Sequence, residues 1–258
     1  MPFDWASKVV FLTGASSGIG RALAIELGRR GASVGLLARR ADLLSEVAGE
    51  VERAGGHALA LTADVRSAGE VRRAAERVRE QWGRIDVLIA NAGMSTTTAG
   101  TALEAAEATE VISINVIGVI NSVAAVLPEM IGQGSGQLVA ISSLASFRGL
   151  PKSGAYSASK AAVSTFFESL RVDLRKSNIV VTTIHPGFIR TPMTAGRRKA
   201  QLPFLVEVDA AARMILKAVE RRARTYAFPW QLAAVVRLIK YLPSPIYDRI
   251  ASNTSFRD

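Results

Sequence analysis

The chain has 258 residues with 32 basic and 22 acidic side chains, a formal net charge of +10, and no cysteine. Without cysteine there are no disulfides or cysteine-ligated metal sites, and two histidines, His57 and His185, form no cluster that could replace them. We therefore expect no metal site. The basic side chains lack the interleaved aromatic residues that stack on bases, so we expect no nucleic-acid partner either.

Hydrophobic residues make up 49% of the chain, enough to bury a substantial core without division into two units. We therefore expect one domain over residues 1–258. Residues 1–5 carry neither a charged leader nor an apolar stretch long enough for export. The predicted location is cytoplasmic.

The first predicted strand, residues 8–12, leads into a glycine-rich turn and then a helix. Glycine is needed where a backbone bends tightly and a pyrophosphate approaches it, and the helix start presents unpaired N–H groups to that anion. The spacing Gly-x-x-x-Gly-x-Gly differs from the commonest dinucleotide fingerprint, so the turn alone leaves a plain glycine turn as an alternative. The predicted cofactor-binding residues here are Gly14, Ser16, Ser17, Gly18, Ile19 and Gly20.

The second predicted strand, residues 33–37, is followed by Ala38, Arg39 and Arg40. A carboxylate at this point would accept hydrogen bonds from the adenosine ribose and repel a phosphate. A guanidinium can instead pair with a 2′-phosphate through two parallel hydrogen bonds. The two arginines favour NADP(H), with two solvated side chains at a helix start as the alternative.

Further apolar runs predict strands at residues 57–61, 85–90, 137–142, 179–185 and 225–228, with helical patterns between most of them. This alternation predicts an α/β fold: a doubly wound, predominantly parallel seven-stranded sheet with helices on both faces. A Rossmann-like sheet binds its ligand over the carboxyl ends of the strands. Candidate residues stand at those ends in turn: Gly14, Arg39, Asp64, Asn91, Ser143 and Pro186.

Tyr156 and Lys160 stand four residues apart after the fifth predicted strand. Helical spacing places both on one face, so the ammonium can lie near the phenol. A free tyrosine keeps its proton until about pH 10, and a nearby positive charge favours the phenolate. The pair therefore makes a plausible proton donor. Taken alone, it is better explained as a chance surface pairing, so its weight comes from the other motifs.

Together these motifs resemble the short-chain dehydrogenase/reductase family, whose members carry Thr-Gly-x-x-x-Gly-x-Gly, Asn-Ala-Gly, Ser, Tyr and Lys in that order. The resemblance covers roughly residues 8–229, and jointly the motifs are highly specific. It implies an NADP(H)-dependent oxidoreductase that transfers a hydride between nicotinamide and a secondary alcohol or ketone. The residues that carry it are Gly14, Gly18, Gly20, Asn91, Ala92, Gly93, Asn115, Ser143, Tyr156, Lys160, Pro186 and Gly187.

The resemblance also implies roles for the other cofactor-binding residues. Asp64 and Val65 meet the adenine ring, and the chain at Ala92 and Gly93 passes close to the ribose, while Asn91 either contacts the cofactor or braces the sheet. Many NADP-linked members carry a basic residue just before the middle glycine, where this chain has Ser17. The predicted contacts beside the nicotinamide carboxamide are Pro186, Gly187, Ile189 and Thr191.

In reduction, the resemblance implies that Tyr156 donates a proton to the carbonyl oxygen and that Ser143 hydrogen-bonds the same oxygen. Lys160 holds the nicotinamide ribose and favours the phenolate. Asn115 keeps a water in line with Lys160, unless it only finds a backbone partner inside an apolar helix. Ser142 competes with Ser143, but neighbouring strand residues face opposite ways, and the family's spacing to the tyrosine selects Ser143.

An apolar pocket is predicted around the reacting group, which favours a hydrophobic carbonyl or alcohol substrate. Residues 190–205 are expected to close over it as a lid, with an ordinary exposed loop as the alternative. A competing function is a cofactor-binding sensor or scaffold that uses the same fold without turnover. The predicted substrate-binding residues are Ser143, Leu144, Tyr156, Phe188 and Met193, with Met94, Phe147 and Leu150 as further pocket candidates.

Residues 230–258 form an apolar and basic tail, with a predicted helix over 230–242 that is too short to span a bilayer. Packing on the core or on a second subunit is favoured over peripheral contact with a membrane. Related enzymes commonly assemble through two long central helices, so the resemblance implies a homodimer or homotetramer.

Overall fold

Seven strands form one sheet in the computed structural model, which describes residues 3–97, 99–195 and 202–252. The strands are β1 (Val9–Thr13), β2 (Ser33–Ala38), β3 (His57–Thr62), β4 (Val87–Ala90), β5 (Gly136–Ile141), β6 (Ile179–Pro186) and β7 (Thr225–Phe228). Their order is β3-β2-β1-β4-β5-β6-β7, and every neighbouring pair is parallel. The predicted strands are confirmed with small shifts at their ends, and the sheet is wholly rather than predominantly parallel.

The burial of each strand explains its sequence pattern. All residues of β1 and β4 are buried, because helices cover both faces of a parallel sheet, and both strands are continuous apolar runs apart from the buried Thr13. The edge strand β3 exposes His57, Ala60 and Thr62. The strand order reverses between β1 and β4, which is where a doubly wound sheet opens a crevice for a ligand.

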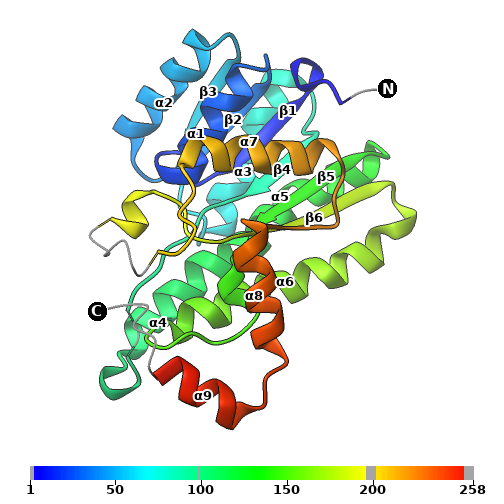
Figure 1. Ribbon diagram of the computed structural model, residues 1–258. Coiled ribbons are helices and arrows are strands. Elements are labelled where there is room, and N and C mark those ends of the chain that lie inside the picture. The colour runs from blue at the N-terminus through cyan, green and yellow to red at the C-terminus, as the bar shows by residue number, and fades with distance from the viewer. Residues whose placement is uncertain (1–2, 98, 196–201, 253–258) are drawn as a thin grey trace.

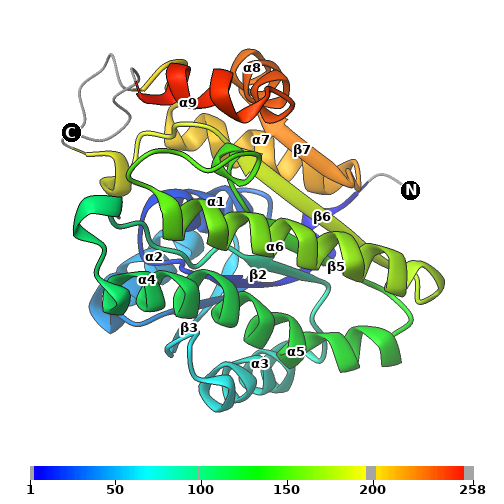
Figure 2. The same cartoon turned by 90° about the horizontal axis from the view of Figure 1, so that it is seen from below.

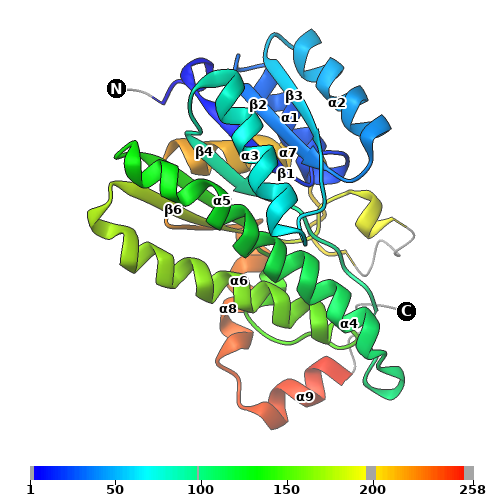
Figure 3. The ribbon, with the colours of Figure 1, turned by 180° about the vertical axis from the view of Figure 1, so that it is seen from behind.

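Helices cover both faces of the sheet. One layer contains α1 (Gly18–Gly28), α2 (Ala41–Arg53) and α7 (Val208–Glu220), and the other contains α3 (Ala68–Trp82), α5 (Gly118–Gly132) and α6 (Gly154–Asp173) (Figures 1 and 3). Each layer closes an apolar cluster against the sheet, centred on Leu23, Leu36 and Ile215 in the first and on Phe11, Val123 and Phe167 in the second. The two-faced α/β architecture is therefore confirmed.

Helix α4 (Ala105–Ile112) continues into α5 through a π-helical turn, Ser113–Ile117. Within the described parts of the chain, the continuous helix Ala105–Gly132 is the one candidate long and apolar enough to cross a membrane by length and composition. Its residues Val119, Val123 and Val126 belong to the second apolar cluster. Packing against the sheet accounts for much of that apolar content.

The predicted tail helix is confirmed as α8 (Trp230–Lys240), and a second helix, α9 (Ser244–Ser252), follows it. Figures 1 and 2 show both at the end of the molecule away from β3. One face of α8 turns inward, with Ala233 buried. The short helices are η1 (Trp5–Ser7), η2 (Gly100–Ala102), η4 (Leu144–Ser146), η5 (Leu174–Lys176) and η6 (Pro192–Thr194).

Candidate active site

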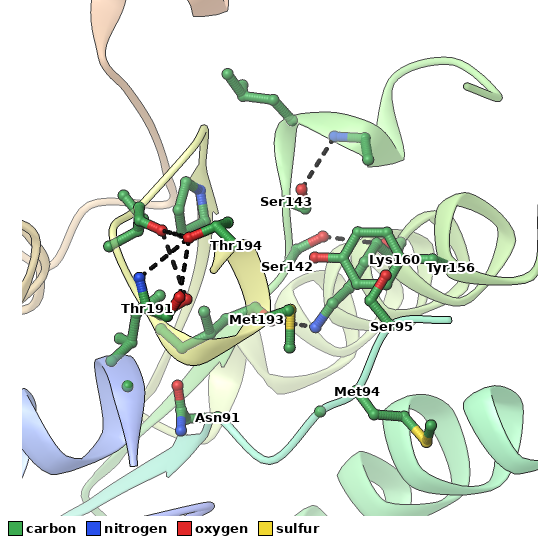
Figure 4. Close-up of a pocket in the computed structure, with 18 of the residues that line it drawn as sticks. Asn91, Met94, Ser95, Ser142, Ser143, Tyr156, Lys160, Thr191, Met193 and Thr194 are labelled. Carbon is green, nitrogen blue, oxygen red and sulfur yellow. Dashed lines mark hydrogen bonds between the residues drawn. The ribbon is translucent and has the colours of Figure 1, made fainter. Parts of the chain in front are cut away.

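A cavity of about 720 Å³ opens at the carboxyl ends of the strands. Every residue predicted for the site lines it except Gly20, Asn115 and the pocket candidate Phe147. Figure 4 shows Ser143, Tyr156 and Lys160 on one side of this space, with Thr191, Met193 and Thr194 across from them. The predicted residues that line it are Gly14, Ser16, Ser17, Gly18, Ile19, Arg39, Arg40, Asp64, Val65, Asn91, Ala92, Gly93, Ser143, Leu144, Tyr156, Lys160, Pro186, Gly187, Phe188, Ile189, Thr191 and Met193.

The glycine-rich turn is packed too closely for side chains. Gly14 has φ +68°, and a Cβ there would lie 2.7 Å from the Ala92 Cα. A Cβ on Gly20 would lie 2.1 Å from the Gly14 carbonyl oxygen, so Gly20 shapes the turn without lining the cavity. Helix α1 starts beside the cavity, and the hydroxyl of its N-cap, Ser17, makes no capping hydrogen bond. The first amides of α1 are therefore suited to an anion.

Two arginines border the cavity beyond this turn. Arg40 donates from Nη2 to the hydroxyls of Ser16 and Ser17, at 3.0 and 2.9 Å. Arg39 is exposed and lines the cavity. The pKa of the Asp64 carboxyl lies below its ordinary value, chiefly because the Arg66 side chain donates to it, with a smaller contribution from the charge of Arg39. Asp64 stays anionic at neutral pH and is paired.

Asn91 braces the strand ends. Its Nδ2 donates to the carbonyl oxygens of Thr13 (3.0 Å) and Gly14 (3.2 Å). The Thr13 hydroxyl accepts in return from the backbone N–H groups of Asn91 and Ala92, each at 3.1 Å. These bonds join β1 to β4 at the point where the strand order reverses. The Asn91 side-chain amide therefore braces the sheet, which is one of the two roles expected for it.

The two serines after β5 face different surroundings. The Ser142 hydroxyl donates to the Lys160 carbonyl oxygen (3.0 Å) and lies 2.8 Å from the Ser164 hydroxyl. Its hydrogen bonds are therefore made to helix α6. The Ser143 oxygen accepts from the Ala145 N–H at 3.1 Å and thereby caps η4. That bond uses a lone pair, so the Ser143 O–H remains able to donate toward the cavity.

Lys160 is almost fully buried one helical turn after Tyr156. Its Nζ donates to the Ile141 carbonyl oxygen at 2.8 Å and lies 5.8 Å from the centre of the Tyr156 ring. Burial lowers the pKa of the Lys160 ammonium to about 8. It is therefore still mostly protonated at pH 7, and its charge in a poorly solvated place favours a phenolate on Tyr156.

Asn115 lies in the π-helical turn and is fully buried. Its Oδ1 accepts from the Met94 N–H (2.8 Å), and its Nδ2 donates to the Met94 carbonyl and the Ser159 hydroxyl, both at 2.9 Å. These bonds fix the chain that follows Gly93. A Cβ on Gly93 would be 3.2 Å from Asn115 Oδ1 and 3.4 Å from Lys160 Nζ, so both groups converge on this glycine.

His185 lies at the strand end as a packing residue. Its Nδ1 is 3.1 Å from the Ser146 hydroxyl, and its ring packs on Phe147 with the ring centres 5.0 Å apart. Burial lowers the pKa of His185 to about 4, so the imidazole is neutral at pH 7. Phe147, an expected pocket residue, is absent from the cavity lining because it packs here. Met94 and Leu150 do line the cavity.

The lid region is described only in part, because residues 196–201 lie outside the described residues. Its base is fixed: Arg190 donates its N–H to the Val206 carbonyl, and Val206 donates to the Phe188 carbonyl, both at 2.9 Å. The Thr194 hydroxyl donates to the Ile189 carbonyl at 2.7 Å. Met193 lines the cavity although its side chain is 45% exposed.

Sequence reasoning missed the wall opposite this base. Helices α8 and α9 line the cavity, and the contributions of α8 follow helical spacing on one face. That periodicity was a usable signal for a buried face, but it does not say what the face covers. Arg148 and Ser95 carry no motif that could have found them. The residues missed include Ser95, Arg148, Leu232, Val235, Val236, Ile239, Tyr247, Ile250 and Ala251.

A family model described as short chain dehydrogenase matches residues 8–202. The chain belongs to the short-chain dehydrogenase family. As a short-chain dehydrogenase it is an oxidoreductase of a family that uses nicotinamide cofactors, and the recognition made from the motifs is confirmed.

Two curated relatives of this short-chain dehydrogenase cover most of it. An uncharacterized oxidoreductase of Myxococcus xanthus (strain DK1622) is 41% identical over 248 residues, which make up 96% of this chain and 98% of that protein. The 11-beta-hydroxysteroid dehydrogenase A of Sesamum indicum is 35% identical over 243 residues, 88% of this chain and 69% of that protein.

Solved structures of other short-chain dehydrogenases share the fold. Levodione reductase superposes with a TM-score of 0.81 at 27% identity, covering 88% of this chain and 98% of the other. A short chain dehydrogenase from Mycobacterium paratuberculosis bound to NAD gives 0.79 at 27% identity, covering 87% and 97%.

Proposed function

We propose that this protein is an NADP(H)-dependent dehydrogenase/reductase that interconverts a hydrophobic secondary alcohol and its ketone. The observation that carries the proposal is one cavity lined both by the glycine-rich turn and by Ser143, Tyr156 and Lys160. A dinucleotide on the turn and a carbonyl compound at the three side chains would then meet in a single space.

The residues present fit a dinucleotide. The close approach of Gly14 to Ala92 leaves bare backbone facing the cavity, and α1 begins there without a side-chain cap. The Gly14–Gly20 turn would hold the pyrophosphate, Asp64 and Val65 the adenine, and Pro186, Gly187, Ile189 and Thr191 the carboxamide end. A bound nicotinamide supplies or accepts the hydride.

Protons and position come from the chain itself. Tyr156 gives its proton to the substrate oxygen in reduction, and the Ser143 hydroxyl donates a hydrogen bond to that oxygen as negative charge builds on it. Lys160 holds the ribose hydroxyls and keeps the phenolate accessible through its charge. Asn115, which converges with Lys160 on Gly93, positions the water that returns a proton through Lys160.

Arg39 and Arg40 support NADP(H) over NAD(H). Both guanidiniums border the cavity beside the turn, and Arg40 is held there by Ser16 and Ser17. The ratio of kcat/KM for NADPH and NADH tests this preference. We expect NADPH to be favoured, and a preference for NADH would overturn the assignment.

The substrate end of the cavity supports a hydrophobic compound, because it is lined by Leu144, Leu150, Phe188 and Met193 together with apolar residues of α8. The test is a screen of ketones and alcohols, including lipid-like and steroid-like compounds, with both nicotinamide cofactors and absorbance near 340 nm. Turnover by any member supports an enzyme. Tight cofactor binding without turnover across the screen would favour a sensor or scaffold instead.

Assembly and location are part of the proposal. Ile117, Ile120 and Ile131 of the α4–α5 helix are exposed by 43%, 37% and 49%, which supports a homodimer or homotetramer through the central helices. We keep the cytoplasm as the expected location. Light scattering after size-exclusion chromatography measures the oligomeric mass, and a monomer at micromolar concentration would contradict the assembly.

A further inference from the structure

The C-terminal helices form a roof over the substrate end of the cavity. This C-terminal roof, residues 230–252 with α8 and α9, supplies Leu232, Val236, Ile239 and Tyr247 to the lining. Yet α8 and α9 each fully bury only one residue among those described, Ala233 and Ala251. A part of the wall with so little buried surface depends on specific contacts to stay in place.

Arg148 makes the most concentrated of those contacts. Its Nη1 lies within hydrogen-bond distance of the carbonyl oxygens of Ile239 (3.2 Å), Lys240 (2.9 Å) and Leu242 (2.8 Å). Ile239 and Lys240 are the last two residues of α8, and Leu242 follows just beyond it, so these carbonyls lie at the negative pole of the helix dipole. The Ile239 carbonyl also accepts from the Leu242 N–H at 3.1 Å. No carboxylate pairs with Arg148 in the described parts of the chain, so the helix end is its counter-charge.

The same guanidinium also holds α9. The Arg148 Cζ lies 4.2 Å from the centre of the Tyr247 ring, a cation–π contact, and the Tyr247 hydroxyl donates to the carbonyl of the next residue, Gly149. One residue earlier, the Phe147 ring lies 5.9 Å from Lys240 Nζ. Residues 147–149 therefore contact both helices of the C-terminal roof.

This segment directly follows the serine that the proposed chemistry uses. Ser143 caps η4, which ends at Ser146, and Arg148 comes two residues later. Ser143, which the proposed chemistry uses, and Arg148, which contacts the C-terminal roof, are therefore only five residues apart.

We propose that Arg148 is a positioning residue that fastens the C-terminal roof over the cavity and thereby sets the affinity for bulky apolar substrates. The inference rests on the proposed function and deepens it. A multi-ring or long-chain ketone at Ser143 and Tyr156 would bury more apolar area against Val236 and Ile239 of the roof than a small ketone would. Arg148 acts on the larger kind of substrate through α8 and does not touch the reacting atoms.

The kinetic test compares Arg148→Gln with wild type on cyclohexanone and on a steroid ketone, with NADPH. We expect KM for the steroid ketone to rise about tenfold, the loss that a charge-assisted hydrogen-bond cluster supports. Its kcat, and both constants for cyclohexanone, stay within about twofold. Arg148→Lys keeps the charge at the helix end and restores part of the affinity. The control is Arg213→Gln, which removes an exposed charge from α7.

Hydrogen exchange of the whole protein without ligand separates this inference from the proposed function. In Arg148→Gln, amides of residues 230–252 should exchange at least about fivefold faster, while β1 and β4 are unchanged. A wild type that reduces no ketone would remove the proposed function, and the exchange result would still decide whether Arg148 fastens the roof. Equal KM changes for both ketones, or unchanged exchange in the roof, would overturn the inference.

Discussion

The two ends of the cavity are built from different kinds of contact. The proposed cofactor end is closed by backbone and polar groups: bare glycine at Gly14, the Asn91–Thr13 bonds between β1 and β4, and Arg40 on Ser17. The substrate end is closed by apolar side chains of α8 and α9. Arg148 holds this part of the wall by hydrogen-bonding the end of α8. We therefore expect substitutions at the substrate end to leave the affinity for the cofactor unchanged.

The largest expected effect breaks the cofactor end. In Gly20→Ala, the new methyl group would lie 2.1 Å from the Gly14 carbonyl oxygen and cannot be accommodated unless the turn opens. We expect NADPH affinity to fall by about a hundredfold or more, because the turn and the start of α1 no longer present their amides together.

NADPH fluorescence titration measures that affinity. The control is Gly132→Ala in α5, where the added Cβ meets nothing within 4 Å. Equal and small losses in both variants would show that the cofactor end tolerates a shifted turn.

Arg39→Ala tests what selects the cofactor within that end. Removing a guanidinium that can make two charge-assisted bonds to a 2′-phosphate should lower the NADPH/NADH ratio of kcat/KM about thirtyfold. Steady-state kinetics with both cofactors measures the ratio. Arg73→Ala, an exposed arginine of α3, is the control. An unchanged ratio in Arg39→Ala would remove this residue from cofactor selection.

Leu232→Ala tests the substrate end. Leu232 packs near Gly187 and lines the cavity, so its truncation should raise KM for a bulky apolar ketone about tenfold while NADPH affinity stays the same. Leu238→Ala removes an α8 residue that is 73% exposed and does not line the cavity, so it should change neither constant. If NADPH affinity falls together with substrate affinity in Leu232→Ala, the two ends are not independent.

Lys160 lies where the two ends meet, and its burial predicts a pH dependence of stability. The native pKa of about 8 is below the value of 10.5 expected for an unfolded lysine, so the unfolded chain binds one more proton between these limits. This group therefore makes the unfolding free energy rise as pH rises from 8 to 10.5, by at most about 1.4 kcal/mol per pH unit.

Urea unfolding of the ligand-free protein at several pH values measures that slope as the difference between wild type and Lys160→Met. Lys217→Met on the exposed side of α7 should keep the wild-type slope. A slope that survives in Lys160→Met would mean that the ammonium is better solvated than its contacts indicate.

The same contrast explains what could be predicted. The cofactor end follows from short local patterns: apolar runs became strands, and their ends brought Gly14, Asp64, Asn91 and Ser143 to one cavity, as parallel strands require. Because neighbouring strand residues point to opposite sides, only one of Ser142 and Ser143 was expected to face Tyr156, and the family's spacing to the tyrosine selected Ser143. The contacts of Ser142 with α6 agree with that choice.

The substrate end depends on contacts distant in sequence. Leu232, Val236 and Ile239 predict an amphipathic helix, but periodicity cannot tell a core from a cavity as its partner. Arg148 meets residues more than 90 positions later, and no local pattern encodes that. The π-helical turn that places Asn115 against Met94 was missed as well, because its sequence reads as an ordinary apolar helix.

The central claim is that one phenol delivers the proton at the meeting point of the two ends. Tyr156→Phe removes that hydroxyl and leaves the ring, so the most direct measurement is single-turnover oxidation of NADPH by this variant with the best ketone from the screen. The account predicts that turnover falls at least about a thousandfold while NADPH binding is retained within about twofold. Turnover close to that of wild type in Tyr156→Phe would contradict it.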